Sequence, residues 1–291
     1  MRPAPWRTRP RRPRAAVERL FAVRALTAAI LLAAFFAAVW FLDRVAFAGV
    51  VAAIVALGAR EWACLAGLGP WPARAYAGAC ALAYLAFAAW LHPLWIGSMP
   101  LVGIWLLAFL FWSMVVPAWF ARGVPLRSRS WLLSAGFVVL VPAALAMAAL
   151  APAALLALLG LVWVADTAAY LAGRAFGRRR LAPAISPGKT WEGVAGGALA
   201  SLAYAIILAV WWPELGRRVT GLIWLAYIAG VVVLCATSVL GDLFESAVKR
   251  HAGVKDSGAL LPGHGGVLDR IDSATAVLPV AALLLACVDA A

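Results

Sequence analysis

The chain has 291 residues, of which 66% are hydrophobic and only 13% are charged, and its mean hydropathy is +0.95. A soluble domain is nearer half apolar and a quarter charged, so this composition excludes an ordinary water-soluble globular protein. The net charge of +13 does not indicate a nucleic-acid partner, because the basic residues lie between apolar runs and no basic recognition element is visible. Fifteen tryptophans fit a membrane protein, since their rings favour the membrane interface. We therefore expect an all-α polytopic membrane protein, because an open strand edge cannot be satisfied in hydrocarbon.

The first region of the chain, residues 1–24, contains eight arginines and is predicted to be a disordered basic tail. Such a segment is typical of an orientation signal that lies against anionic headgroups at the cytoplasmic face. A cleaved signal peptide is the alternative. The apolar run that follows is longer than a typical signal-peptide core and ends in Asp43-Arg44 without a clear small-residue cleavage site, which argues against cleavage.

About nine apolar segments of spanning length follow the tail, and we expect each to be a transmembrane helix. They cover residues 25–42, 45–59, 75–91, 100–120, 131–150, 151–172, 193–212, 221–240 and 273–289. The second and ninth are short, and only Pro142 and Pro152 divide the fifth from the sixth. The chain is thus predicted to have N-terminal transmembrane helices over residues 25–160 and a C-terminal transmembrane region over residues 161–291, and the charged motifs described below make the second region the catalytic one.

The distribution of lysine and arginine predicts the orientation of these spans. With the N-terminus in the cytoplasm, 22 of the 25 basic residues lie in inside segments, and only Arg44, Arg217 and Arg218 lie outside. This asymmetry follows the positive-inside rule and favours a cytoplasmic N-terminus in the cell (inner or plasma) membrane. It also requires residues 173–192 and 241–272 to face the same side, the cytoplasm.

Carboxylates and lysines are scarce in this chain and gather in the C-terminal region. Eight of the twelve acidic residues lie between Asp166 and Asp272, and all three lysines, Lys189, Lys249 and Lys255, fall in the same stretch. Lysine is a compact point charge that proteins often use to bind phosphate. An ionisable residue within a span, such as Asp166, is by default a candidate for function.

The densest charged segment begins at Asp242. Asp242, Glu245, Ser246 and Lys249 are spaced i, i+3, i+4 and i+7, which places them on one face of a helix. A polar face that continues an apolar span is costly in lipid, so it indicates a water-filled site.

A glycine-rich turn, Gly263-His264-Gly265-Gly266, follows this helix, and Asp269 and Asp272 then stand one turn apart at the head of the last span. Glycine lets backbone N–H groups approach a phosphate closely. Carboxylates bind hard divalent cations, usually Mg²⁺, which bridge phosphate oxygens. The segment therefore predicts a site for a nucleoside triphosphate, and a solvated loop with ordinary ion pairs is the alternative.

Two other patterns in this region are set aside. Residues 186–190, Ser-Pro-Gly-Lys-Thr, look like the end of a nucleotide-binding P-loop, but the earlier glycine is missing and no preceding strand is expected. His251 and His264 have no third partner at zinc spacing, so we expect no zinc, and His264 is a candidate phosphate contact.

At these residues the sequence resembles the phosphatidate cytidylyltransferases (CDP-diacylglycerol synthases). The family signature consists of Ser-x-x-Lys-Arg, Lys-Asp, His-Gly-Gly and Asp-Arg-x-Asp at set spacings. Its positions here are Ser246, Lys249, Arg250, Lys255, Asp256, His264, Gly265, Gly266, Asp269, Arg270 and Asp272. The segments around Asp166, Ser186–Gly193 and Arg60–Trp62 resemble family segments too, although Ala169 stands where the family usually has glycine.

The resemblance implies that CTP and phosphatidate react to give CDP-diacylglycerol and diphosphate, with Mg²⁺ required; the sequence leaves open whether one or two metal ions act. It also implies a homodimer. The candidate metal ligands are Asp242, Glu245, Asp269 and Asp272. The candidate catalytic residues are Asp166, Asp242, Lys249, Lys255, Asp269 and Arg270. The candidate substrate-binding residues are Ser186, Lys189, Ser246, Arg250, Asp256, His264, Gly265 and Gly266.

Other functions compete with this interpretation. A CTP-dependent polyprenol kinase would also bind CTP beside a lipid but would transfer the γ-phosphate, and a related cytidylyltransferase would use an ether-linked archaeal lipid. A secondary transporter typically has internal repeats and broken helices at mid-membrane, and neither is visible here. An inactive scaffold is disfavoured by the intact set of carboxylates and lysines.

Overall fold

The fold is known from a computed structural model that describes residues 14–91, 96–122, 128–260 and 265–289. Its helical elements are α1 (Arg14–Phe41), α2 (Arg44–Leu65), α3 (Pro70–Leu91), α4 (Met99–Leu110), the π-helical turn η1 (Phe111–Val115), α5 (Val116–Ala121), α6 (Arg129–Ala149), α7 (Pro152–Phe176), α8 (Trp191–Trp211), α9 (Pro213–Arg218), α10 (Ile223–His251) and α11 (Leu268–Asp289). Among the described residues, eight helical segments are long and apolar enough to cross a membrane, and Ala29–Phe41 of α1 is a shorter apolar helix. The prediction of an all-α polytopic membrane protein is confirmed.

Three local predictions differ from the structure. Helix α1 begins at Arg14, inside the segment expected to be disordered, because the chain after Pro13 lacks helix breakers; residues 1–13 lie outside the described residues. Helix α2 continues beyond residue 59 to Leu65 and carries Glu61 within its last two turns. Residues 180–190, where no strand was expected, form an antiparallel hairpin of β1 (Arg180–Ala182) and β2 (Ser186–Thr190).

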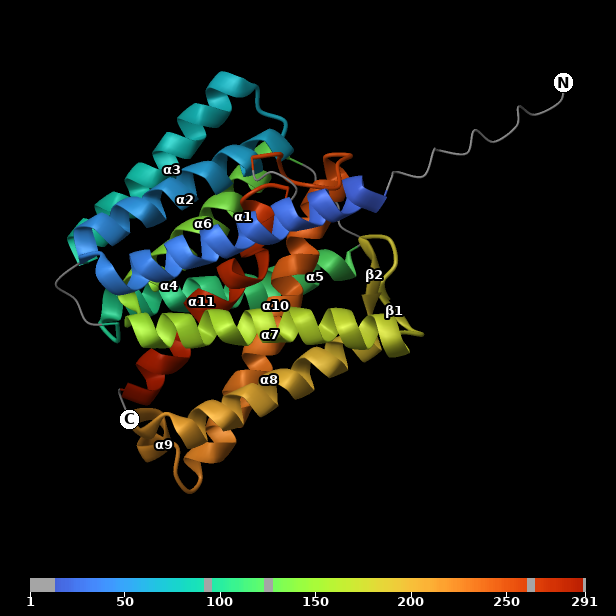
Figure 1. The fold of residues 1–291 in the computed structure, drawn as a ribbon. Helices are drawn as coiled ribbons and strands as arrows, with labels where there is room; N and C mark the ends of the chain where they lie inside the picture. The colour runs from blue at the N-terminus through green and yellow to red at the C-terminus, as the bar shows by residue number, and fades with distance from the viewer. Residues whose placement is uncertain (1–13, 92–95, 123–127, 261–264, 290–291) are drawn as a thin grey trace, which may run out of the picture.

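Helices α7 and α8 pack closely along their length because α8 presents a row of small residues. Its buried positions, Gly193, Gly197, Ser201, Ala205 and Ala209, recur every fourth residue and so share one face. Small residues let two backbones approach, which is how membrane helices gain packing energy when lipid is as apolar as they are. Figure 1 shows α7 and α8 as neighbouring helices with the hairpin at one end.

Phe244 of α10 lies at the centre of an aromatic cluster that holds α10 against the N-terminal half of the chain. The rings of Trp62, Phe111, Trp112 and Trp119 lie 5.1–5.9 Å from the Phe244 ring, centroid to centroid. Trp62 and Trp112 are almost fully buried. These rings therefore pack the core next to the charged face of α10, so contact with protein accounts for this group of tryptophans.

Segments far apart in the sequence meet at one end of the bundle, where α2, α7 and α10 finish and α8 and α11 start. We call this the charged end. The hairpin and the loop after α10 lie there, whereas α9 and the C-terminus lie at the opposite end (Figure 1). An ion pair between Lys189 and Asp242 confirms that residues 173–192 and 241–272 share one side of the molecule.

Candidate active site

The charged end contains the predicted polar face of α10. Asp242, Glu245, Ser246 and Lys249 all lie on this helix, as their spacing predicted. The Ser246 hydroxyl donates to Asp242 Oδ1 at 3.2 Å, and Lys249 Nζ lies 2.8 Å from Glu245 Oε2. The face thus combines two carboxylates with one cation on successive turns.

Lys249 connects this face to helix α11. Its Nζ also lies 2.6 Å from Asp269 Oδ1, so one ammonium group bridges two carboxylates on different helices. The side chains of Lys249, Glu245 and Asp269 are only 12%, 4% and 7% exposed. A buried charge needs a close partner to offset its lost hydration, so these three groups depend on one another.

Asp269 is the most fully hydrogen-bonded carboxylate of the site. Its Oδ2 accepts from the backbone N–H of Gly266 at 2.8 Å and from the backbone N–H of Ser257 at 3.0 Å. The Ser257 hydroxyl lies 3.1 Å from the same oxygen. Asp269 therefore ties Ser257, inside the loop between α10 and α11, to Gly266, at the end of the loop where α11 begins.

Glu61 of α2 is a buried member of this site that the sequence analysis did not select. It accepts hydrogen bonds from the backbone N–H groups of Val267 and Leu268, both at 3.0 Å, and its Oε2 lies 2.9 Å from the Ser257 hydroxyl. The first N–H groups of a helix lack partners within the helix, and Glu61 satisfies two of them for α11. Two signals were available: Arg60–Trp62 resembles a family segment, and Glu61 is an ionisable residue beside an apolar run. Glu61 was not selected because the second span was predicted to end at residue 59.

The glycines of the turn are required by close contacts. Gly265 has φ +82°, and a Cβ there would lie 2.6 Å from Asp269 Oδ2. A Cβ at Gly266 would clash with Ser257 Oγ and with Glu61 Oε2. Gly265 and Gly266 thus let the loop approach the carboxylates, whereas the neighbouring candidate His264 lies outside the described residues.

The hairpin places a second lysine in the site. Lys189 of β2 forms an ion pair with Asp242 Oδ2, and the two side chains are 24% and 29% exposed. Arg250 donates to the carbonyl oxygens of Ile185 at 3.3 Å and Val254 at 3.1 Å, which fastens the hairpin to the end of α10. Ser186 lies at the first position of β2.

The conformation of residues 186–190 shows that they do not form a P-loop. A strand, β1, does precede them, contrary to expectation, but the five residues are themselves a β-strand rather than a loop that wraps around phosphate. Thr190 then caps helix α8, since its hydroxyl accepts from the Gly193 N–H at 3.1 Å. Rejecting a P-loop NTPase was correct, although the stated reason about the strand was wrong.

Asp272 of α11 lies close enough to three other carboxyl groups for their negative charges to repel one another. These three groups belong to Asp166, Asp242 and Glu245. Glu245 Oε1 is buried and has no hydrogen-bond partner among the described residues. Such a cluster favours the binding of a cation.

The four predicted metal ligands are divided by lysines rather than gathered around one point. Asp242 pairs with Lys189, and Lys249 lies between Glu245 and Asp269. Within the described ranges, no three His, Cys, Asp or Glu side chains are arranged as a ready metal site. The donor chemistry still suits Mg²⁺, because all four groups are carboxylates and one of their buried oxygens is left without a partner.

The remaining candidates lie at the rim of the site. Lys255 and Asp256 are exposed in the loop after α10, and Asp256 Cβ lies 3.7 Å from the position that a Cβ on Gly265 would occupy. Arg270 is exposed in the first turn of α11. Asp166 of α7 is exposed as well, and it reaches the site through charge interactions with Asp242 and Lys189 and a side-chain hydrogen bond with Ser273.

The fold and this site define a class of protein: a multi-pass membrane protein with a lysine–carboxylate centre at one end of its helices. Comparison with known proteins identifies the family. The sequence model of the cytidylyltransferase family matches residues 22–288. The chain therefore belongs to the cytidylyltransferase family and is a membrane-embedded nucleotidyltransferase.

Several similar proteins are named phosphatidate cytidylyltransferase. The one from Pseudomonas aeruginosa is 40% identical over 270 residues, which is 90% of this chain and 96% of that protein. The one from Haemophilus influenzae is 55% identical over 122 residues, 41% of each chain. The one from Staphylococcus epidermidis is 47% identical over 125 residues, 43% of this chain and 46% of that protein.

Proposed function

We propose that this protein is a phosphatidate cytidylyltransferase that converts CTP and phosphatidate to CDP-diacylglycerol and diphosphate. The observation that carries the proposal is the near-full-length similarity to the Pseudomonas aeruginosa protein of that name. The site agrees with it, because lysines and carboxylates converge at the end of membrane helices, where a water-soluble nucleotide can meet a lipid headgroup.

The chemistry requires positioning and charge neutralisation rather than a protein nucleophile. A phosphate oxygen of phosphatidate attacks the α-phosphorus of CTP, a new P–O bond forms, and the bond from the α-phosphorus to the bridging oxygen of diphosphate breaks. Both reactants are anionic, so the cations must lower the repulsion between them. Lys189, Lys249 and Arg250 contribute positive charge at the hairpin and α10, and Lys255 and Arg270 contribute it at the rim.

Mg²⁺ fits this site as the metal cofactor. Asp242, Glu245, Asp269 and Asp272 would hold it, and Asp166 would add negative charge nearby. A bound Mg²⁺ would supply neutralisation of the charge that develops on the leaving diphosphate. Whether one or two ions bind, and whether the chain forms a homodimer, remain predictions of the family resemblance.

We further propose that the charged end faces the cytoplasm and that the N-terminus lies on the same side of the cell membrane. The support is the lysine and arginine distribution, since only Arg44, Arg217 and Arg218 fall at the opposite ends of the spans. In this orientation CTP would reach the site from the cytoplasm, and phosphatidate would reach it from the adjoining leaflet of the membrane.

The position of a radioactive label in CTP tests the reaction class. Purified protein in detergent, with phosphatidate and Mg²⁺, is expected to transfer an α-phosphate label to lipid and to release a γ-phosphate label as diphosphate. A CTP-dependent lipid kinase would instead transfer the γ label to lipid. Transfer of the γ label, or of neither label by a folded protein with several phosphatidate species, would overturn the proposal.

A further inference from the structure

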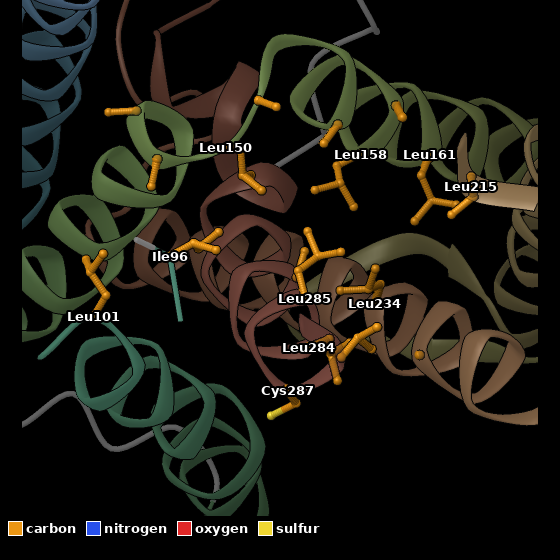
Figure 2. Close-up of a pocket in the computed structure, with 18 of the residues that line it drawn as sticks. Ile96, Leu101, Leu150, Leu158, Leu161, Leu215, Leu234, Leu284, Leu285 and Cys287 are labelled. Carbon is orange, nitrogen blue, oxygen red and sulfur yellow. The ribbon is translucent and has the colours of Figure 1, made fainter. Parts of the chain in front are cut away.

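A large cavity occupies the half of the molecule away from the candidate active site. It has a volume of about 1310 Å³ and is lined by parts of α2, α3, α4, α6 to α11 (Figure 2). Sites for drug-sized ligands usually measure about 300–1,000 Å³, so this cavity is large enough for a bigger ligand. The residues labelled in Figure 2 are mostly apolar, for example Leu158, Leu161 and Leu234.

The cavity is as deep as one leaflet of a bilayer. Along α10 its lining runs from Ile223 to Leu234, which is about 16 Å at 1.5 Å per residue. Half of a bilayer's hydrocarbon core is about 15 Å thick. The lining therefore covers about half of the length that α10 needs to cross the hydrocarbon core, and it ends two turns of α10 before Asp242.

The two tyrosine hydroxyls in the wall already have hydrogen-bond partners. The Tyr204 hydroxyl donates to the Ala157 carbonyl at 3.2 Å, and the Tyr227 hydroxyl donates to the Ala205 carbonyl at 2.9 Å. With these hydroxyls paired, the described part of the wall is mainly apolar and suits hydrocarbon chains.

Charge is concentrated at the mouth of the cavity. Among the described residues that line it, the charged ones are Arg44 at the start of α2 and Glu214 and Arg218 in α9. Glu214 Oε1 lies 3.6 Å from a guanidinium nitrogen of Arg217, which precedes Arg218 in α9. Two arginines and one glutamate among the described lining residues leave a net positive charge at the mouth, at the depth where a lipid phosphate lies.

We propose that this cavity binds an anionic phospholipid of the leaflet opposite the active site, with its acyl chains between α7, α10 and α11 and its phosphate at Arg44 and Arg218. This site is separate from the site of the reaction, because it opens at the other ends of the helices. The proposal does not depend on the proposed function, and its test does not use activity.

Two cysteines provide the test within one molecule. Cys287 lines the cavity (Figure 2), and Cys64 lies near the end of α2 at the charged end; both are exposed free thiols. Purified full-length protein in detergent micelles would be treated with N-ethylmaleimide at rising mole fractions of phosphatidylglycerol or phosphatidylcholine. Mass spectrometry of the peptides would follow the alkylation of each cysteine.

Phosphatidylglycerol is expected to protect Cys287 at a lower mole fraction than phosphatidylcholine does and to leave Cys64 unchanged. Arg44→Gln and Arg218→Gln should each raise by about 5-fold the mole fraction of phosphatidylglycerol that half-protects Cys287 from alkylation. Arg217→Gln is the matched control, because Arg217 is on the same short helix as Arg218 but does not line the cavity. The protection of Cys287 by phosphatidylglycerol should be the same in this variant as in the wild type.

Three results would overturn the proposal. Equal protection by the two lipids would mean that the cavity does not select an anionic headgroup. Absence of protection by either lipid would mean that no lipid occupies it. Protection of Cys287 that depends on protein concentration and not on lipid would identify a second copy of the chain as the occupant.

Discussion

Asp269 and Asp242 belong to the same charged end but are held in contrasting ways. Asp269 is 7% exposed and is fixed by Lys249, by two backbone N–H groups and by Ser257. Asp242 is 29% exposed and is held by Lys189 and Ser246. The first part of the site, which includes Glu61, is a rigid framework that joins α2, α10 and α11. The second, at the hairpin, is open enough to meet a substrate.

This difference separates residues whose loss should damage the fold from residues whose loss should damage chemistry alone. Buried charges without partners are strongly destabilising, whereas exposed ion pairs contribute little to stability. Variants in the framework and at the hairpin should therefore give different ratios of stability loss to activity loss.

The largest effect on stability is expected for Lys249→Met. Removal of the ammonium group leaves the carboxylates of Glu245 and Asp269 buried without their shared cation. Thermal or chemical unfolding in detergent should show a loss of about 3–5 kcal/mol. Lys255→Met is the control, since Lys255 is exposed and its loss should lower activity while unfolding stays unchanged. Equal stability of the two variants would remove the distinction between framework and rim.

Glu61→Gln should have the next largest effect. A side-chain amide can accept with one oxygen only, so its NH₂ group would face one of the donors that Glu61 now satisfies, the N–H of Val267 or Leu268. The expected destabilisation is about 1–3 kcal/mol. The exposed neighbour Arg60 provides the control, and Arg60→Gln should leave the unfolding midpoint in place. A stable Glu61→Gln protein would show that α2 does not organise the start of α11.

Two glycines with similar backbone angles separate conformational strain from contact. Gly265 (φ +82°) and Gly253 (φ +73°) both adopt the left-handed conformation, so alanine should cost each about 1–2 kcal/mol. Only at Gly265 would the new Cβ press on Asp269, because nothing lies within 4 Å at Gly253. Gly265→Ala should thus be less stable than Gly253→Ala by about 1 kcal/mol or more. Comparison of the two unfolding curves would reveal the contact, and identical curves would argue against it.

The smallest change in stability is expected at the hairpin. Lys189→Met removes a partly exposed pair, so unfolding should shift by less than about 1 kcal/mol. The value of kcat/KM for CTP should nevertheless fall about 100-fold, by analogy with the loss of one electrostatic contact to a transition state. Lys189→Arg, which keeps the charge, should restore part of the activity. A Lys189→Met protein with wild-type kinetics would exclude this lysine from substrate binding.

Much of the fold follows from the sequence because membrane helices are specified by local hydrophobicity. Among the described residues, eight of the nine predicted spans correspond to helices long and apolar enough to cross a membrane, and the first corresponds to the shorter apolar helix Ala29–Phe41. The spacing of Asp242, Glu245 and Lys249 predicted one helical face. The pairing of the hairpin with α10 was anticipated only as a shared side of the membrane, because positive charge indicates orientation but not contact.

The part that the sequence did not reveal depends on distant partners. Glu61 acts on backbone N–H groups about 200 residues away, and backbone donors have no sequence signal of their own. The burial of Trp62 and Trp112 likewise depends on Phe244, which only tertiary packing brings near. The β-hairpin was missed because a charged, proline-containing segment reads as loop.

The central claim is that the carboxylates of α10 and α11 form a Mg²⁺-dependent centre for nucleotidyl transfer. The most direct measurement is CDP-diacylglycerol formation from CTP and phosphatidate by wild type and by Asp242→Asn, each with Mg²⁺ or EDTA. Thermal unfolding of both proteins would be recorded alongside, because Asp242 lies in the open part of the site and its variant should remain folded. The account predicts product from wild type with Mg²⁺ only and almost none from Asp242→Asn. Undiminished product in EDTA, or from the folded variant, would contradict it.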